Sequence, residues 1–305
     1  MKNSNYIFFL LSIATIFFLT TSCEEDISST VQLAEGPELV VIDAWINNKP
    51  EPQIINLTTT QTFFDNSGVV GISGAEVLVI GSSGEQFLFE EGQNGEYIWT
   101  PAAGETFGTI GEDYALAVTH NGITYASASS MNRVPPIDSI TFRFEEANAF
   151  LEDSYIASFW ARDPEGTGDS YWIRTWRNEE FLGAPDQINV AFDAGFSQGG
   201  AVDGLIFITP IREGINAFED EDGVFLSPYV PGDSIFVELH AIPNEAAFFL
   251  NEVRLQTDRP GGFAELFAAP LSNVPTNIFA SDGETEVLGF FTVSAVSSLG
   301  ERLEE

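Results

Sequence analysis

The chain has 305 residues and a formal net charge of −35, because 46 acidic residues outnumber 11 lysines and arginines. So acidic a surface repels nucleic-acid phosphates and anionic lipid headgroups, which excludes nucleic-acid binding and charge-driven docking on a membrane. The single cysteine excludes an internal disulfide, so buried apolar side chains, among them 27 Phe and 5 Trp, must supply the core.

The N-terminus has the pattern of a bacterial lipoprotein signal peptide. Lys2 precedes an uncharged apolar run over residues 7–19, which is shorter than the roughly 20 residues of a membrane-spanning helix and matches the apolar region of a secretory signal. Small residues then lead to Cys23. We therefore predict a signal peptide over residues 1–22 and lipid attachment at Cys23. An ordinary signal with an incidental cysteine is the alternative, but Cys23 is the only cysteine and stands where lipidation requires it.

Three acidic residues, Glu24, Glu25 and Asp26, follow that cysteine. They resemble the export signal that directs many lipoproteins to the outer face of the outer membrane; the alternative is the solvated start of a tether. Residues 23–37 lack hydrophobic periodicity, which indicates an acidic tether between the lipid and the first strand. We expect a protein that its lipid anchors in the outer membrane and that faces the cell exterior.

Residues 38–130 have the pattern of a small antiparallel β-sandwich. An apolar run opens this segment, and short alternating runs separated by Gly- and Asn-rich turns follow it. The clearest hairpin joins residues 114–120 to residues 123–130 through Asn121-Gly122, a pair that favours a type I′ turn because both positions need positive φ. An immunoglobulin-like sandwich is the architecture that this pattern indicates.

The paired prolines Pro135 and Pro136 cannot continue a sheet ladder, so residues 131–136 are predicted to be the junction to a second β-rich domain, residues 137–305. One short helix is predicted there near residues 244–257, because apolar side chains recur at helical spacing. The fold class is therefore mainly β, with two consecutive antiparallel β-sandwich domains. The strands expected in the second domain are 137–145, 155–162, 170–176, 204–211, 233–241 and 286–296.

Several short motifs stand in a fixed order along the chain: Val41–Ile46, Gly74–Val77, Gly95–Tyr97, Gly122, Val134-Pro135, Asn273–Ile278 and Leu288–Phe291. Their order and spacing resemble a Bacteroidota lipoprotein family described as domain of unknown function 4249. The segment 74–125 is also similar to transthyretin-like modules of carboxypeptidase regulatory regions. The family resemblance implies an outer-membrane lipoprotein, often encoded beside a TonB-dependent transporter. It brings no activity, so no functional residue beyond Cys23 follows from it.

One motif matches a hydrolase pattern by its letters. Residues 195–199 spell G-x-S-x-G around Ser197, and His240 lies downstream. The nucleophile elbow needs a strand before the serine and a helix after it, whereas a glycine-rich stretch follows here. Paired carboxylates for glycoside cleavage cannot be selected among so many acidic residues. We therefore expect no enzyme and no catalytic residue.

Metal and cofactor sites are not predicted either. The chain has two histidines and no zinc motif. Acidic residues 219–222 and the Asp- and Gly-rich turn 163–169 offer oxygen ligands for an irregular calcium site, but a solvated acidic loop explains both.

Aromatic residues supply the remaining candidates for binding. Trp172 and Trp176 lie on one predicted strand beside Tyr171, with Trp160 on the strand before it. Because neighbours on a strand point to opposite faces, only one side of this strand can form a binding platform. Packing in the core is the stronger interpretation of these aromatic side chains.

The leading functional hypothesis is a non-catalytic accessory or ligand-binding component of a TonB-dependent uptake system. A structural or adhesive cell-surface module, which pairs with other chains through exposed sheet edges, is the alternative. A hydrolase of unknown type ranks third.

Overall fold

The structure is a computed structural model that describes residues 36–61, 68–147, 153–217, 229–259, 261–262, 267–268 and 270–304. Glu38–Thr60 and Val69–Glu305 form one compact unit, to which all the elements below belong. The chain is mainly β, as the sequence predicts, and most strand pairs are antiparallel. No helix in the described ranges is long and apolar enough to span a bilayer.

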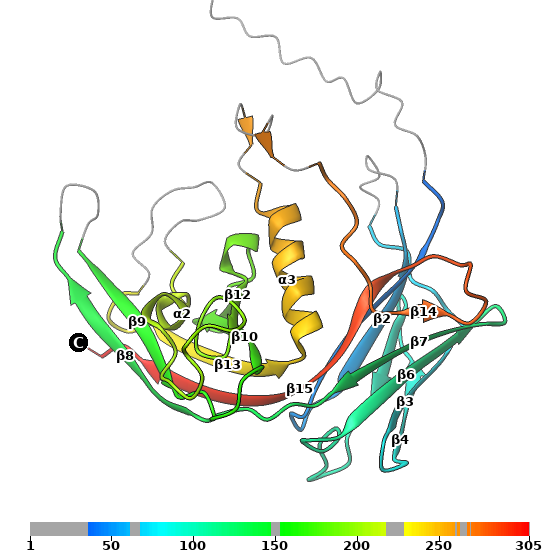
Figure 1. The fold of residues 1–305 in the computed structure, drawn as a ribbon, viewed down its shortest axis with the longest axis horizontal. Helices are drawn as coiled ribbons and strands as arrows, with labels where there is room; N and C mark the ends of the chain where they lie inside the picture. Colours follow the sequence, from blue (N-terminus) through cyan, green and yellow to red (C-terminus); the bar gives the residue numbers. More distant parts are fainter. Residues whose placement is uncertain are drawn as a thin grey trace, which may run out of the picture. The chain divides into compact units, whose positions relative to one another are not determined.

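A thirteen-stranded sheet organises the molecule (Figure 1). Its strands follow the order β11-β10-β13-β15-β1-β2-β5-β4-β3-β6-β7-β14, and β12 pairs with β10 beside this path. Two further strands, β8 and β9, pair with each other. The strands are β1 (Val40–Asn47), β2 (Gln53–Thr59), β3 (Glu76–Gly81), β4 (Gln86–Glu91), β5 (Glu96–Trp99), β6 (Asp113–His120), β7 (Ile123–Ser130), β8 (Ile137–Glu145), β9 (Ser154–Ala161), β10 (Ser170–Arg177), β11 (Glu180–Phe181), β12 (Asn189–Phe192), β13 (Ser234–Ile242), β14 (Phe279–Ala280) and β15 (Val287–Arg302).

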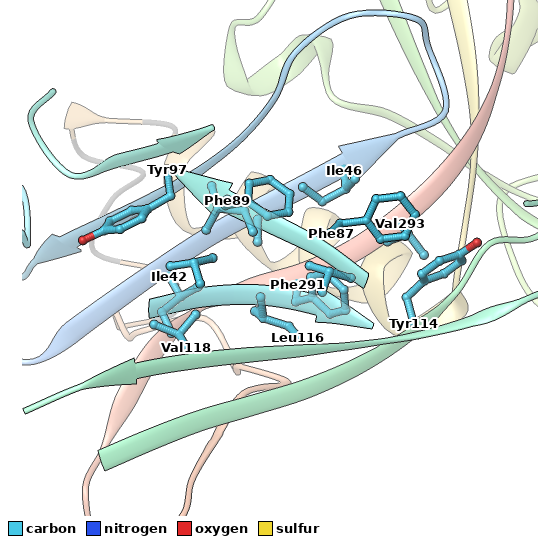
Figure 2. Close-up of a cluster of buried hydrophobic side chains, with 14 of the residues drawn as sticks. Ile42, Ile46, Phe87, Phe89, Tyr97, Tyr114, Leu116, Val118, Phe291 and Val293 are labelled. Carbon is cyan, nitrogen blue, oxygen red and sulfur yellow. The ribbon is translucent and has the colours of Figure 1, made fainter. Parts of the chain in front are cut away.

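The first core lies between the β1-β2-β5 strands and the β3-β6-β7 strands. β4 belongs to both groups, because Phe89 pairs with β3 while Glu90 and Glu91 pair with β5. The predicted hairpin is present, with φ values of 50° at Asn121 and 80° at Gly122. Figure 2 shows side chains from both groups of strands meeting in this core. Its largest members include Ile42, Phe87, Tyr97, Tyr114 and Phe291.

The last strand, β15, is shared between the two halves of the sheet. Val287–Ser294 pair with β1 in parallel, and Ala295–Arg302 pair with β13 in antiparallel orientation. The predicted division at residues 131–136 did not anticipate this sharing, because side chains such as Phe291 and Val293 belong to the first core. The strand also continues beyond its predicted end at residue 296, where its sequence becomes polar and no longer shows an apolar run.

The second core lies on one face of the β10-β13-β15 strands. Tyr171 and Ile173 of β10 and alternate residues of β13 are buried there with Phe159 of β9. Strands β8, β9, β10 and β13 lie within a residue of their predicted ranges. The predicted strand 204–211 is wrong. Ile206 makes only a single bridge to Arg162, and Thr209–Glu213 then form helix α2, whose first turn accommodates Pro210.

Helix α3 (Asn244–Thr257) confirms the predicted helix. It begins directly after Pro243 and buries Ala246, Ala247 and Leu250. These side chains pack with residues of β12 and with Phe290, which forms a third, smaller core. α3 therefore covers part of the sheet face opposite the second core, and the rest of that face carries the candidate site.

Candidate functional site

Side chains of β10 and β13 that point away from the second core form a surface that we call the outer face. The register places Trp172 opposite His240, Arg174 opposite Glu238 and Trp176 opposite Phe236. Side chains alternate along a strand, so these six share one face while their neighbours fill the second core. The outer face is completed by Phe181 of β11, whose ring lies 5.1 Å from that of Trp176.

Arg174 is enclosed by aromatic rings. Its guanidinium carbon lies 4.8 Å from the centroid of Trp172, 5.1 Å from that of Trp176 and 4.8 Å from that of Phe181. Its Nε is buried without a hydrogen-bond partner. Burial lowers the pKa of the guanidinium from its ordinary value, although an arginine in a protein stays protonated.

Glu238 lies beside Arg174 but is bound to other residues. Its Oε1 accepts a hydrogen bond from Lys49 Nζ at 2.8 Å, and its Oε2 lies 2.9 Å from His240 Nε2. Burial opposes ionisation of this carboxyl, but the hydrogen bonds from His240 and Lys49 prevail and lower its pKa to about 2.

His240 is buried, and burial lowers its pKa, so its imidazole is neutral near pH 7. Because ionised Glu238 only accepts, Nε2 of His240 must carry the proton, which leaves Nδ1 as an acceptor 3.1 Å from the Ser294 hydroxyl oxygen.

Two hollows border Arg174 and the aromatic rings that surround it. An open groove of about 660 Å³ is lined by Lys49, Trp176, Phe236, Glu238 and Arg302, among others. A smaller cavity of about 250 Å³ lies between the sheet and α3. Its walls include Trp45, Trp172, Arg174, Phe249 and Val253. Apolar hollows with a few convergent polar groups are the usual form of small-molecule sites.

Of the three tryptophans that the sequence nominated, two lie together. Trp172 and Trp176 share the outer face, whereas Trp160 lies on β9. There its Nε1 donates to Thr141 Oγ1 at 2.8 Å and Arg212 covers its ring at 3.8 Å. Sequence reasoning missed Arg174, although its position between two tryptophans of the same strand was a usable signal.

The serine and histidine of the hydrolase alternative are not brought together. Ser197 is exposed in the turn after β12, while both ring nitrogens of His240 contact other side chains, Glu238 and Ser294. The chain Ser294–His240–Glu238 has the residue types of a catalytic triad. However, Ser294 is 3% exposed and its hydroxyl also lies 3.3 Å from the carbonyl oxygen of Ile46, so no substrate reaches it.

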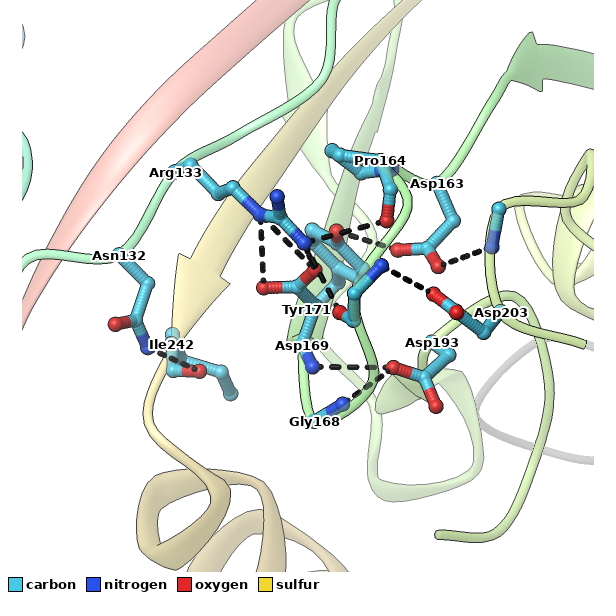
Figure 3. A network of polar contacts seen from close by, with 12 residues as sticks. Asn132, Arg133, Asp163, Pro164, Gly168, Asp169, Tyr171, Asp193, Asp203 and Ile242 are labelled. Carbon is cyan, nitrogen blue, oxygen red and sulfur yellow. Dashed lines mark hydrogen bonds and ion pairs between the residues drawn. The ribbon is translucent and has the colours of Figure 1, made fainter. Parts of the chain in front are cut away.

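Three carboxylates that could hold a metal ion gather beside the turn 163–169. Oxygens of Asp163, Asp169 and Asp193 lie within 4.8 Å of one another. Figure 3 shows that protein groups already surround them. Arg133 Nη2 donates to Asp169 Oδ2 at 2.7 Å and to the carbonyl oxygen of Gly166 at 2.9 Å.

The two buried members of this cluster accept hydrogen bonds from within the fold. Asp163 accepts from the Tyr171 hydroxyl at 2.7 Å, and Asp193 accepts from the backbone N–H of Gly168 at 2.8 Å. Burial raises the pKa of Asp163. The cluster and Arg133 therefore fasten the turn to the sheet.

Several sequence-predicted sites lie outside the described residues. These are Cys23, the export signal Glu24–Asp26 and the acidic segment 219–222.

The sequence was also compared with known proteins. The profile of a family described as a domain of unknown function (DUF4249) matches residues 24–299. The comparison with curated proteins gave no match.

Proposed function

The chain belongs to the DUF4249 family, and from its N-terminal sequence and its outer face we propose that it is a lipid-anchored outer-membrane lipoprotein, of the kind found in Bacteroidota, that binds a ligand for a TonB-dependent uptake system. In this proposal the lipid on Cys23 holds the protein at the cell exterior, and Glu24, Glu25 and Asp26 direct its export. The protein catalyses no reaction and passes its ligand to the transporter.

The observation that carries the proposal is the groove on the outer face. Its aromatic wall, Trp176 and Phe236, provides apolar contact, and Phe236 is 39% exposed although it lies on a central strand. Lys49, Glu238 and Arg302 provide polar groups in its lining. Trp176, Phe236, Glu238 and Arg302 lie on hydrogen-bonded strands, which hold their side chains in a fixed geometry that suits recognition.

The anchor is tested by mass spectrometry of the mature protein. We expect an N-terminal peptide that begins at Cys23 and carries acyl mass. Cys23→Ser should release the protein from the membrane fraction, because acyl carbons supply about 0.8 kcal/mol of membrane affinity per buried CH₂. Ser22→Ala keeps a small residue before the cleavage site and should remain anchored. An N-terminal peptide without acyl mass would contradict the proposal.

The partner is tested by purification from native membranes and by growth. We expect a tagged protein to bring down a TonB-dependent transporter, and a deletion strain to lose uptake of at least one nutrient. Complementation with wild type should restore uptake, whereas Cys23→Ser should not. If no transporter co-purifies and every nutrient tested is still taken up, the proposal fails.

A second candidate function is favoured by one edge strand. The large sheet ends in β11 and β14, which have two residues each and offer little to a partner strand. In contrast, β8 has nine residues, and within the described ranges only β9 pairs with it. Strand addition at β8 is therefore the route for a structural or adhesive role. A deletion strain that loses surface attachment and keeps nutrient uptake would favour this second role.

A further inference from the structure

The smaller cavity next to Arg174 has no role in the fold described so far. Its volume of about 250 Å³ is below the roughly 300–1,000 Å³ of pockets for drug-sized ligands, so it suits a small molecule. Its walls come from the sheet on one side, with Trp45 and Trp172, and from α3 on the other, with Phe249, Leu250 and Val253. These walls are apolar, and Arg174 is the charged residue among those that line the cavity.

Arg174 forms no ion pair with a carboxylate among the described residues, although the chain has 46 acidic residues. The carboxylate directly across the strand pair, Glu238, is bound by Lys49 and His240. Within the described part of the chain, Arg174 forms no ion pair and donates no hydrogen bond. A guanidinium has five N–H donors, and cation–π contacts use its charge without occupying them. The protein therefore presents unused donors and a positive charge to an apolar space.

We propose that this cavity binds a small apolar acid, with its carboxylate on the guanidinium of Arg174 and its apolar body against Trp172, Phe249 and Leu250. This inference goes beyond the proposed function, because the cavity shares no lining residue with the groove that carries that proposal. The guanidinium matches a carboxylate with two parallel hydrogen bonds, and the low dielectric of the apolar walls strengthens them. Ligands with several negative charges are disfavoured, since the cavity offers one cation in a strongly acidic protein.

Titration of the purified protein with matched acids and amides tests the proposal. Phenylacetate and hexanoate carry the predicted head and body, and phenylacetamide and hexanamide keep the shape without the charge. Trp45 and Trp172 line the cavity, so intrinsic fluorescence reports occupancy, and calorimetry gives the dissociation constant. We expect each acid to bind roughly 10- to 100-fold more tightly than its amide. Acetate, which lacks the apolar body, should bind more weakly than either acid.

Substitution of the arginine gives the second arm. Arg174→Gln should remove the preference for the acid over the amide. Arg212→Gln is the matched control, because Arg212 also covers a tryptophan and has buried nitrogens without partners, but does not line the cavity. Val253→Trp fills the cavity from α3 and leaves Arg174 intact, so it should block binding even if Arg174→Gln fails to fold.

The outcomes separate this inference from the proposed function. Equal binding of acid and amide, absence of saturable binding by either acid, or unchanged binding in Arg174→Gln or Val253→Trp would each overturn the ligand class. None of these results bears on acylation of Cys23 or on co-purification with a transporter. Conversely, a protein without acyl mass that still binds acids through Arg174 would overturn the membrane proposal alone.

Discussion

Glu238 shows how one buried residue determines the chemistry of its neighbours. It is 2% exposed, yet it is ionised because Lys49 and His240 both donate to it. Because Glu238 engages these two donors, its cross-strand neighbour Arg174 forms no ion pair within the described ranges. The positive charge at the cavity is therefore a consequence of how Glu238 is bound.

Glu238→Gln should destabilise the protein by about 2 kcal/mol at pH 7, because one neutral amide cannot replace two charge-assisted hydrogen bonds. The folded pKa of about 2 lies below the ordinary 4.5, so the unfolded chain takes up the proton first as pH falls. The contribution of ionised Glu238 to the free energy of unfolding is complete above about pH 4.5 and is lost towards pH 2. Urea unfolding of both proteins from pH 7 to pH 3 measures the difference.

The control for this prediction is Glu301→Gln, which removes an exposed carboxylate at the rim of the same groove and should change stability little. A stability difference between wild type and Glu238→Gln that stays constant down to pH 3 would contradict the assigned role.

At the scale of elements, β15 depends on a close approach to β1. Gly289 pairs with Ile42 and has φ of +98°, a conformation that residues with side chains rarely adopt. A Cβ at this position would lie 2.0 Å from the carbonyl oxygen of Ile42. A glycine is therefore required where the strand enters the first core.

Gly289→Ala should destabilise the protein by about 3 kcal/mol, since the backbone must leave its native conformation and the two strands must separate. Gly300→Ala, on the same strand, is the matched control. Its Cβ would meet Phe236 at 3.4 Å, an ordinary contact, and its φ is not positive. Thermal and urea unfolding measure both variants, and equal losses would refute the role assigned to Gly289.

At the scale of the whole molecule, self-repulsion acts on a fold with a net charge of −35. The Debye length falls from about 30 Å at 0.01 M salt to about 8 Å at 0.15 M, so added salt screens repulsion between distant carboxylates. Ion pairs such as Arg133–Asp169 and Arg177–Asp233 lie within hydrogen-bond distance. Because this distance is much shorter than the Debye length, salt weakens these attractions less than it weakens the long-range repulsion.

The melting temperature should therefore rise by roughly 2–4 °C between about 10 mM and about 150 mM NaCl, which corresponds to about 1 kcal/mol for a protein of this size. Scanning calorimetry at both concentrations measures the change. Potassium chloride should raise the melting temperature by the same amount. Sucrose of equal osmolality does not change the ionic strength, so it should not reproduce this dependence on salt. A melting temperature that is flat or falls over this range would contradict the prediction.

Much of the fold follows from local pattern in the sequence. Asn121-Gly122 identified its hairpin because positive φ is a local requirement, and the apolar spacing from Ala246 to Val253 identified α3. In contrast, the sharing of β15 depends on pairing between residues more than 200 positions apart, which no local pattern encodes. Arg174 was missed for a related reason. The role of Arg174 depends on which residues bind Glu238. One of them, Lys49, lies far from both Arg174 and Glu238 in the sequence.

The sheet cannot be completed until β15 has been synthesised, because β15 pairs with strands in both halves of the sheet. Among the described strands, a ribosome produces β1 first, whereas β15, which covers one edge of β1, follows all the others. The early strands must stay without that neighbour until residues 287–294 have been made. A product truncated before Val287 would lack a strand in both halves of the sheet, so proteases should degrade such fragments quickly.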